Sequence, residues 1–466
     1  MASLAGLLRE HGHAVTGSDQ DVYPPMSTQL EALGIEIRSP YAEANVPPEA
    51  DLVVIGNALS RGNPEVEVVL DRKLRMTSLP ALVGEAFLQE RTSLVVAGTH
   101  GKTTTTSLLA WLLDRGGLDP SFLVGGVPVD FGRSYRLGRG RHFVIEGDEY
   151  DCAFFDKRPK FVHYRPDLAV IGNVEHDHAD IYPDLAAVQT AFLRLLSVIP
   201  RRGLLVAGVE SPALVELLPR AHCRVETFGL AAGADWRAVD VRRSSGHTRF
   251  RLLVRGKDEG EFSLGLLGDY NVRNALAALA VAQGAGLAPA ACRQALVEFK
   301  GVKRRLEVRG TEAGVTVFDD FAHHPTAVRA TLEALRGSRE APRTDPGAPG
   351  GRLVAVFEPR SYTSRTRVFQ EAFAQAFGAA DAVVVAAAHL PGKLPERERL
   401  SEAELVAGIR ARGTRADFVP EVDAIVARLV GDLRKGDRVV ILSNGGFGGL
   451  HEKLLAGLRL ARESGL

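Results

Sequence analysis

The sequence predicts an α/β protein of three domains with mostly parallel sheets. Its 466 residues suit about three domains at roughly 150 residues each. Short apolar runs typical of buried strands alternate with helical patterns along the chain, which is the order expected of parallel sheets. One glycine-rich segment lies directly between such a strand and a helix. We therefore expect a central P-loop ATPase-like domain between Rossmann-like N- and C-terminal domains, with domains at 1–91, 92–308 and 309–466.

The first domain begins with a helical pattern at 4–11, followed by an extended segment at 14–17 and a second helix that ends near Leu30. Residues 51–56 form an apolar run closed by glycine, which indicates a buried parallel strand. A doubly wound domain normally starts with a strand and a glycine-rich turn. We therefore expect this domain to lack its first strand.

The other two domains show the same alternation of strand and helix. A loop rich in glycine, proline and arginine at 337–352 is expected to lie on the surface, since the strand pattern resumes directly after it. The strands are expected at 93–97, 143–145, 168–171, 315–318, 353–357, 382–385 and 438–442.

The composition excludes several classes of protein. The chain has 57 basic and 57 acidic residues, so no overall field favours nucleic acid or an anionic membrane, and small-molecule substrates are expected. No apolar run reaches the roughly 18 residues of a membrane span. Cys152, Cys223 and Cys292 show no metal-binding spacing. These features favour a reducing cytoplasmic location.

The glycine-rich segment has the features of a phosphate-binding loop. Glycines let backbone amides approach an anion, Lys102 can neutralise β and γ phosphates, and the Thr103 hydroxyl can bind Mg²⁺. The strict Walker spacing would place glycine at position 96, where this chain has Val96, so the loop is a variant. The alternative is a glycine turn with a solvated lysine. The expected ATP-binding residues of the loop are Gly98, Thr99, His100, Gly101, Lys102, Thr103 and Thr104.

Two acidic segments, at 144–151 and 173–178, follow predicted strands. The carboxyl ends of parallel strands meet at one edge of a sheet, so both segments should face the phosphate loop. Oxygen ligands with one imidazole suit Mg²⁺ better than zinc. Solvated loop acids are the alternative interpretation.

Six segments, taken in order, resemble the Mur ligases over essentially the whole chain: GTHGKTTT, EGDEYDCAFFDKRPKFVHYRP, GNVEHDHADIY, GDYNVRNALAALA, GVKRRLEVRG and FDDFAHHPTAV. The resemblance implies an ATP-dependent amide ligase that uses Mg²⁺. SDQDVYPPMSTQLEALGI, GNALSRGNPEVE and SNGGFGGLHEKLL resemble the member that joins L-alanyl-γ-D-glutamyl-meso-diaminopimelate to UDP-N-acetylmuramate in peptidoglycan recycling. The alternatives are the L-alanine-adding ligase, a non-catalytic Mur-fold binding protein and a P-loop kinase.

The resemblance also implies roles for individual residues. Lys102 would contact the γ-phosphate, Thr103 and Glu146 would bind the first Mg²⁺, and His178 with Glu175 would bind a second. Several Mur ligases support that metal with a carbamylated lysine, but 181–200 contains no lysine. The nucleotide contacts would be Asn271 and Asn274 for adenine, Asp320 for ribose and Arg305 for the phosphates.

The remaining expectations concern catalysis and the peptide. Lys102, Arg305 and His323 form the expected catalytic set, with His323 close to the transferring phosphoryl group. Three domains that share one substrate are expected to stand open without it, as a monomer or weak homodimer. The tripeptide would contact Arg360, Ser361, Thr363, Ser443 and Asn444.

Overall fold

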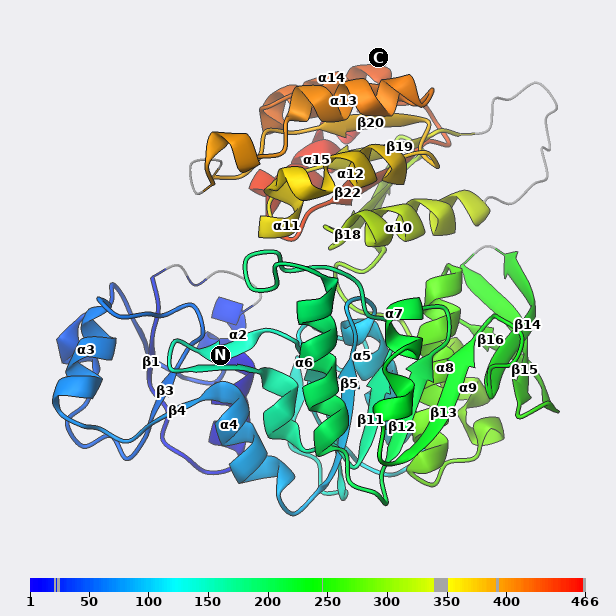
Figure 1. Cartoon of the computed structure of the whole chain (residues 1–466). Coiled ribbons are helices and arrows are strands. Elements are labelled where there is room, and N and C mark those ends of the chain that lie inside the picture. The colour runs from blue at the N-terminus through cyan, green and yellow to red at the C-terminus, as the bar shows by residue number, and fades with distance from the viewer. Residues whose placement is uncertain (21, 23–25, 245, 339–350, 391–393, 464–466) are drawn as a thin grey trace.

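The computed structural model describes residues 1–463 except for positions 21, 23–25, 245, 339–350 and 391–393. Three domains follow one another along the chain, and the C-terminal domain lies above the central one (Figure 1). Each domain alternates strands and helices, so the predicted three-domain α/β fold with mostly parallel sheets is confirmed. Most of the predicted surface loop at 337–352 lies outside the described residues.

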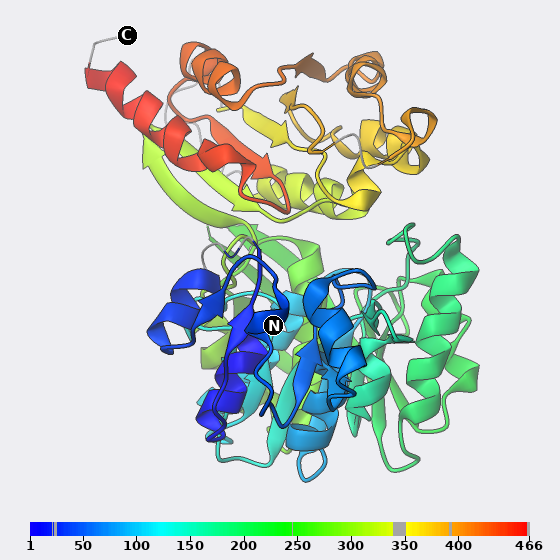
Figure 2. The same ribbon diagram turned by 90° about the vertical axis from the view of Figure 1, so that its left-hand side faces the viewer.

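The N-terminal domain lies beside the central domain and below the C-terminal one (Figure 2). Its elements are α1 (Ala2–Glu10), β1 (Gly17–Ser18), α2 (Met26–Ala32), β2 (Ile37–Arg38), β3 (Val53–Ile55), α3 (Pro64–Asp71), β4 (Met76–Ser78) and α4 (Leu79–Val83). Strand β1 pairs with β2 and β3 pairs with β4, both in parallel. Leu4 and Leu7 of α1 are buried in a cluster with Tyr135 of the central domain, so the first helix is anchored to that domain.

The central domain is built on a ten-stranded sheet in the order β16-β15-β14-β13-β12-β11-β5-β8-β6-β7. Its strands are β5 (Thr92–Ala97), β6 (Ser121–Leu123), β7 (Tyr135–Arg136), β8 (His142–Gly147), β11 (Leu168–Ile171), β12 (Leu204–Gly208), β13 (Arg224–Gly229), β14 (Trp236–Ser244), β15 (His247–Val254) and β16 (Lys257–Leu264). A separate hairpin joins β9 (Asp151–Ala153) to β10 (Asp156–Pro159). Its helices are α5 (Lys102–Arg115), α6 (Leu185–Val198), α7 (Pro212–Val215), α8 (Asp269–Gly284) and α9 (Arg293–Glu298).

Both faces of this sheet are buried, as its apolar strands predict. On β5, Leu94 and Val96 pack into one hydrophobic cluster, whereas Val95 and Ala97 pack into another. This alternation follows from the two-residue repeat of a strand. Helices therefore cover the sheet on both sides.

The C-terminal domain has a six-stranded sheet in the order β17-β18-β22-β19-β20-β21, parallel except for β17. Its strands are β17 (Glu307–Glu312), β18 (Val315–Asp320), β19 (Leu353–Phe357), β20 (Ala382–Val385), β21 (Arg415–Phe418) and β22 (Arg438–Leu442). Its helices are α10 (Pro325–Gly337), α11 (Tyr362–Arg365), α12 (Gln370–Ala376), α13 (Glu402–Ala411), α14 (Val422–Asp432) and α15 (Leu450–Glu463). The expected domain boundary after residue 308 falls inside β17.

Three adjacent strands place the predicted site at one edge of the central sheet. β5 pairs in parallel with β8 on one side and with β11 on the other. Ala97 is in register with Gly147 and with Ile171, so all three strands end at the same level. The loops that follow them therefore meet. Over the part of the chain that the structure describes, no helix is both long enough and apolar enough to cross a membrane.

Candidate active site

The loop between β5 and α5 needs its two glycines for shape as well as for space. Gly98 and Gly101 have φ values of 132° and 82°, which side-chain-bearing residues rarely adopt. A Cβ atom at Gly98 would lie 2.9 Å from the Gly172 amide nitrogen, and one at Gly101 would lie 2.5 Å from Asn274 Oδ1. The loop delivers the chain into α5, whose amino terminus carries partial positive charge. This is a site for an anion.

The Lys102 side chain is only 11% exposed and is held by the loop and by two acids. Its Nζ atom donates to the Gly98 carbonyl at 2.7 Å and to Glu149 Oε2 at 2.9 Å, and it lies 3.9 Å from Asp148 Oδ1. Burial alone would lower the pKa of Lys102, but the two carboxylates outweigh it and raise that pKa above its ordinary value. The lysine is therefore positively charged, and its Nζ atom lies against the loop backbone at Gly98.

Glu149 links Lys102 to His178, a role that its position in the acidic segment did not predict. Its Oε1 atom lies 3.1 Å from His178 Nε2, and its carbonyl accepts a hydrogen bond of 2.6 Å from the Tyr182 hydroxyl. The Tyr150 ring lies 4.0 Å from the imidazole, centroid to centroid. Burial would raise the pKa of Glu149, but Lys102 and His178 lower it to about 2. A charged carboxylate thus sits between the two predicted residues.

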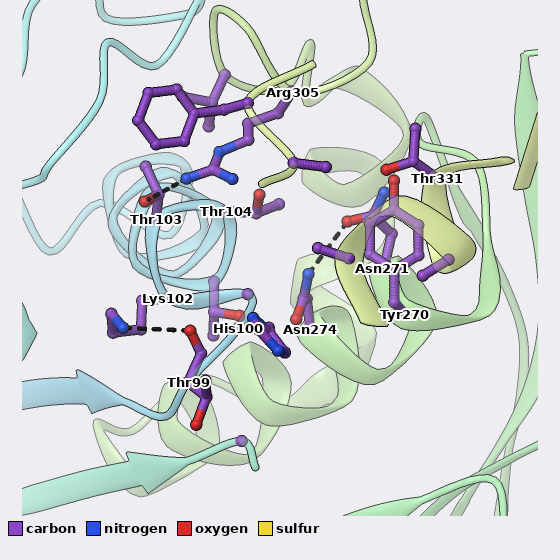
Figure 3. Close-up of a pocket in the computed structure, with 18 of the residues that line it drawn as sticks. Thr99, His100, Lys102, Thr103, Thr104, Tyr270, Asn271, Asn274, Arg305 and Thr331 are labelled. Atoms are coloured by element: carbon purple, nitrogen blue, oxygen red, sulfur yellow. Dashed lines mark hydrogen bonds between the residues drawn. The ribbon is translucent and has the colours of Figure 1, made fainter. Parts of the chain in front are cut away.

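Glu146 and Thr103 meet as the sequence predicts. The Thr103 hydroxyl donates to Glu146 Oε1 at 2.9 Å, and the Gly125 amide donates to Oε2 at 2.7 Å. Arg305, in the segment that leads into β17 of the C-terminal domain, places Nη2 3.3 Å from the Thr103 hydroxyl (Figure 3). Burial, with Asp148 as the second cause, raises the pKa of Glu146 above its usual value. This carboxylate lacks a full counter-charge, as expected of a residue that binds a cation.

Glu175 does not join His178 as expected. Its Oε2 atom accepts a 2.6 Å hydrogen bond from the Thr326 hydroxyl and lies 3.5 Å from His100 Nε2. The carboxylate beside His178 is Glu149 instead. Both acids follow strand ends, and a sequence does not specify which way a loop side chain turns.

Some polar atoms of the predicted nucleotide-binding residues already make hydrogen bonds within the protein. Asn271 and Asn274 lie on α8, where Asn274 Nδ2 donates to Asn271 Oδ1 at 3.1 Å (Figure 3). Asp320 is buried, and its carboxylate accepts amide hydrogen bonds from Leu306 at 2.7 Å and Ala322 at 2.8 Å. Asp320 therefore fixes the linker to the C-terminal domain, which limits its expected role as a ribose contact.

His323 is half-buried and neutral. Its Nδ1 atom lies 2.9 Å from the Phe321 carbonyl oxygen, so this nitrogen carries the proton. Burial lowers the pKa of His323 to about 4. An imidazole of such low basicity is a poor acceptor for an ammonium proton but keeps a lone pair on its other nitrogen.

The central and C-terminal domains contact each other directly. Thr326, at the start of α10, donates to Glu175 at 2.6 Å, and Thr363, on α11, donates to Asp177 at 2.6 Å. Both acceptors lie in the loop after β11. Short hydroxyl-to-carboxylate hydrogen bonds are among the stronger polar contacts, so this pair stabilises a closed arrangement.

Three of the five predicted peptide contacts line the cavity, namely Ser361, Thr363 and Asn444. The Asn444 Oδ1 atom is buried and makes no hydrogen bond to any described residue. An unpaired buried acceptor is costly, so it is a candidate contact for a donor on a substrate.

Arg360 and Ser443 are not among the residues that line the cavity. Arg360 Nη1 lies 3.6 Å from Glu358 Oε1, and the Ser443 hydroxyl also donates to that carboxylate. The Arg360 side chain packs where a Cβ atom at Gly445 would stand. These two residues hold the loop that carries Asn444. They were predicted to contact the peptide, but neither lines the cavity.

A single cavity of about 1100 Å³ collects these groups. It lies between the phosphate loop, the acidic strand ends, α8 and the C-terminal domain, and this size is ample for a nucleotide. Residues from both domains line it. Among the predicted residues on its wall are Thr99, His100, Gly101, Lys102, Thr103, Thr104, Glu146, Glu175, His178, Asn271, Asn274, Arg305, Asp320 and His323.

A phosphate loop opposed by acids and a cross-domain arginine defines an enzyme class that uses a nucleoside triphosphate. The comparisons with known families specify it further. Residues 1–91 match the model "Mur ligase family, catalytic domain", 96–282 the "Mur ligase middle domain" and 304–445 the "Mur ligase, glutamate ligase domain". The chain belongs to the Mur ligase family, as the sequence predicted.

Within this family, the chain is similar to individual proteins whose reactions are named. The chain is 42% identical over 467 residues to the UDP-N-acetylmuramate–L-alanyl-γ-D-glutamyl-meso-2,6-diaminoheptandioate ligase of Escherichia coli K12, covering 100% of this chain and 97% of that protein. It is 37% identical to the crystal structure of a murein peptide ligase from Psychrobacter arcticus, with a TM-score of 0.72 over 98% of this chain and 96% of that one. An L-alanine ligase of Salinibacter ruber is 37% identical, covering 96% of this chain and 90% of that protein.

Proposed function

We propose that this member of the Mur ligase family uses ATP to join L-alanyl-γ-D-glutamyl-meso-diaminopimelate to the lactyl carboxylate of UDP-N-acetylmuramate. The observation that carries the proposal is the buried series of contacts from Lys102 through Glu149 to His178, at the ends of adjacent strands. The relatives from Escherichia coli and Psychrobacter support the tripeptide as the substrate. The L-alanine ligase matches less closely.

The first step joins a carboxylate to phosphorus. A carboxylate oxygen of UDP-N-acetylmuramate forms a bond to the γ-phosphorus while the bond to ADP breaks, which gives an acyl phosphate. Lys102 would exchange Glu149 for a phosphate oxygen, and Arg305, next to Thr103, would reach the same group. Their charges would stabilise the oxygens on which negative charge develops.

The second step forms the amide. The tripeptide amine attacks the acyl carbon, a C–N bond forms, and phosphate leaves with the electron pair of the broken C–O bond. The ammonium proton must be lost before this attack. His323 lines the same cavity, but its low pKa suits a positioning role better than that of a base.

Mg²⁺ fits the acids beside the loop. We propose Thr103 and Glu146 as ligands of a first Mg²⁺ ion and His178 as a ligand of a second, with the Glu149 carboxylate beside His178. Burial and Asp148 raise the pKa of Glu146, which supports a cation beside this carboxylate. When bound, Mg²⁺ would offset charge on the phosphate oxygens. Glu175 is assigned elsewhere, because its contacts are with His100 and Thr326.

The arrangement of the domains suggests which residues would bind the other substrates. The N-terminal domain, 1–91, would hold the UDP-sugar, and Ser361, Thr363 and Asn444 would contact the tripeptide. Asn271 and Asn274 would contact adenine. We propose a cytoplasmic protein, since the three cysteines are unpaired, acting as a monomer or weak homodimer without nucleic acid or membrane partners.

ADP release with UDP-N-acetylmuramate and each of two amines tests the proposal. The tripeptide should support turnover at a kcat/KM well above that of L-alanine, with a muramyl tripeptide as product. Turnover with L-alanine alone would assign the chain to the alternative ligase. ADP release without an amide product would favour a kinase, and no ADP release in any mixture would favour a non-catalytic binding protein.

A further inference from the structure

A second group of metal-binding side chains lies outside the proposed Mg²⁺ site. His100 Nε2 lies 3.5 Å from Glu175 Oε2, His324 Nδ1 lies 4.0 Å from the same oxygen, and all three atoms lie within 4.8 Å of one another. His100 belongs to the phosphate loop, Glu175 to the loop after β11, and His324 to the C-terminal domain. The group therefore spans two domains.

Both imidazoles place a ring nitrogen at this point. His100 Nε2 is buried and makes no hydrogen bond that satisfies distance and angle in the described part of the chain. His324 Nε2 lies 3.2 Å from the His176 carbonyl oxygen, so that nitrogen carries the proton and Nδ1 keeps its lone pair. This Nδ1 atom accepts only a long 3.3 Å hydrogen bond from the Thr326 amide. A backbone carbonyl that fixes the imidazole in this way is a usual neighbour of a metal-binding histidine.

The distances are close to those of an occupied site. Zn²⁺ holds imidazole and carboxylate atoms at about 2.0–2.2 Å in a tetrahedron, which places ligand atoms roughly 3.4 Å apart. The separations of 3.5 Å and 4.0 Å need only a small movement to reach that value. Two imidazoles and one carboxylate suit zinc and similar ions, whereas Mg²⁺ prefers oxygen ligands.

We propose that His100, Glu175 and His324 bind a transition-metal ion such as Zn²⁺ that fastens the C-terminal domain to the phosphate loop. Two ligands come from the central domain and the third from the N-cap of α10, so the bound ion opposes domain opening. Glu175 also accepts the Thr326 hydroxyl, which keeps its carboxylate oriented from the same side. These three side chains lie in the wall of the cavity that also holds the proposed ATP site, but none of them is assigned to either Mg²⁺ ion or to the reacting groups. Zn²⁺ binding is measured without turnover, so its failure and the failure of the proposed function are distinguishable.

Zn²⁺ titration against a chromophoric chelator, with excess Mg²⁺ to fill the Mg²⁺ site, tests the proposal. The whole chain should bind one tight equivalent, and Co²⁺ in its place should give the visible bands of a tetrahedral site. His324→Gln and Glu175→Gln should each weaken binding by more than the roughly 10–100-fold that loss of an outer partner costs.

Two control variants separate this site from the others. His178→Gln changes the proposed Mg²⁺ site, and His163→Gln changes the group of Cys152, Asp156 and His163, which also has metal-ligand spacing. Both should retain the tight Zn²⁺ equivalent. Circular dichroism melts show whether each variant is folded. Absence of tight binding in the unmodified protein, or equal binding in folded His324→Gln and Glu175→Gln, overturns the proposal.

Discussion

Replacing Glu149 with glutamine removes the charge between Lys102 and His178 without changing the side-chain volume. The carboxylate is almost completely buried and contacts Lys102 Nζ at 2.9 Å and His178 Nε2 at 3.1 Å. Its pKa falls from 4.5 to about 2 in the folded protein. At about 1.36 kcal/mol per unit, this fall corresponds to about 3 kcal/mol of stabilisation. Breaking a buried ion pair costs a similar amount, about 3–5 kcal/mol.

Urea unfolding near pH 7.5, followed by circular dichroism, measures this loss for Glu149→Gln. The matched control is Asp148→Asn, because Asp148 lies 3.9 Å from Lys102 Nζ and its side chain is 31% exposed. The control should lose less than about 1 kcal/mol. An unchanged unfolding free energy in Glu149→Gln would refute the inference that this ion pair stabilises the site.

The pH dependence checks the sign of the effect. The folded-state pKa of Glu149 is depressed, so its stabilisation is complete above the unfolded value of 4.5 and is lost as pH falls toward about 2. The difference between the unmodified protein and Glu149→Gln should therefore shrink below about pH 4.5. Glu149 also raises the pKa of His178, so the part of the difference that comes from the charged imidazole is complete below the ordinary value of 6.5 and is lost as pH rises through the raised pKa. A difference that grows below pH 4.5 would contradict the assignment.

Three further substitutions test other parts of the site. Lys102→Met should lower kcat/KM for ATP by roughly 10²–10³-fold because it removes a charge from the developing phosphate oxygens, and ADP release measures it; a smaller loss than tenfold would contradict this role. Gly101→Ala should destabilise the chain by about 1–3 kcal/mol in the same urea assay, because Gly101 has a φ of 82° and the new Cβ atom would meet Asn274. The control is Gly431→Ala in α14, where a Cβ atom meets nothing within 4 Å, and this change should be neutral or stabilising. Thr363→Val leaves the buried Asp177 carboxylate without its 2.6 Å hydrogen-bond donor, so the contact between the two domains should weaken by about 1–3 kcal/mol. Limited proteolysis between the domains should then be faster in Thr363→Val than in Thr363→Ser, which keeps the hydroxyl. Equal rates in the two variants would argue against this contact.

The sequence predicts the fold and the central elements of the site because these depend on local patterns. The strand before Gly98 and the helix after Lys102 follow from apolar periodicity and glycine placement, and the structure has them as β5 and α5. The rule that parallel strands end at one edge places Glu146 and His178 near Lys102, and the structure does so too.

Contacts made by loop side chains could not be predicted in the same way. Glu149 stands three residues after Glu146 in the same acidic segment, but only the turn after β8 shows that it faces Lys102. Glu175 turns to Thr326 of another domain, a partner more than a hundred residues away in the chain. Asp320 was expected to meet ribose because of the resemblance to the Mur ligases, yet its oxygens satisfy two buried backbone amides.

The fate of the lactyl carboxylate oxygens tests the central claim most directly. UDP-N-acetylmuramate labelled with ¹⁸O in both carboxylate oxygens is incubated with ATP, Mg²⁺ and the tripeptide, and the released phosphate is analysed by mass spectrometry. Phosphate that carries one ¹⁸O atom, formed together with ADP and the muramyl tripeptide, is the predicted result. Unlabelled phosphate beside the same amide product would contradict attack of the carboxylate on the γ-phosphoryl group at Lys102.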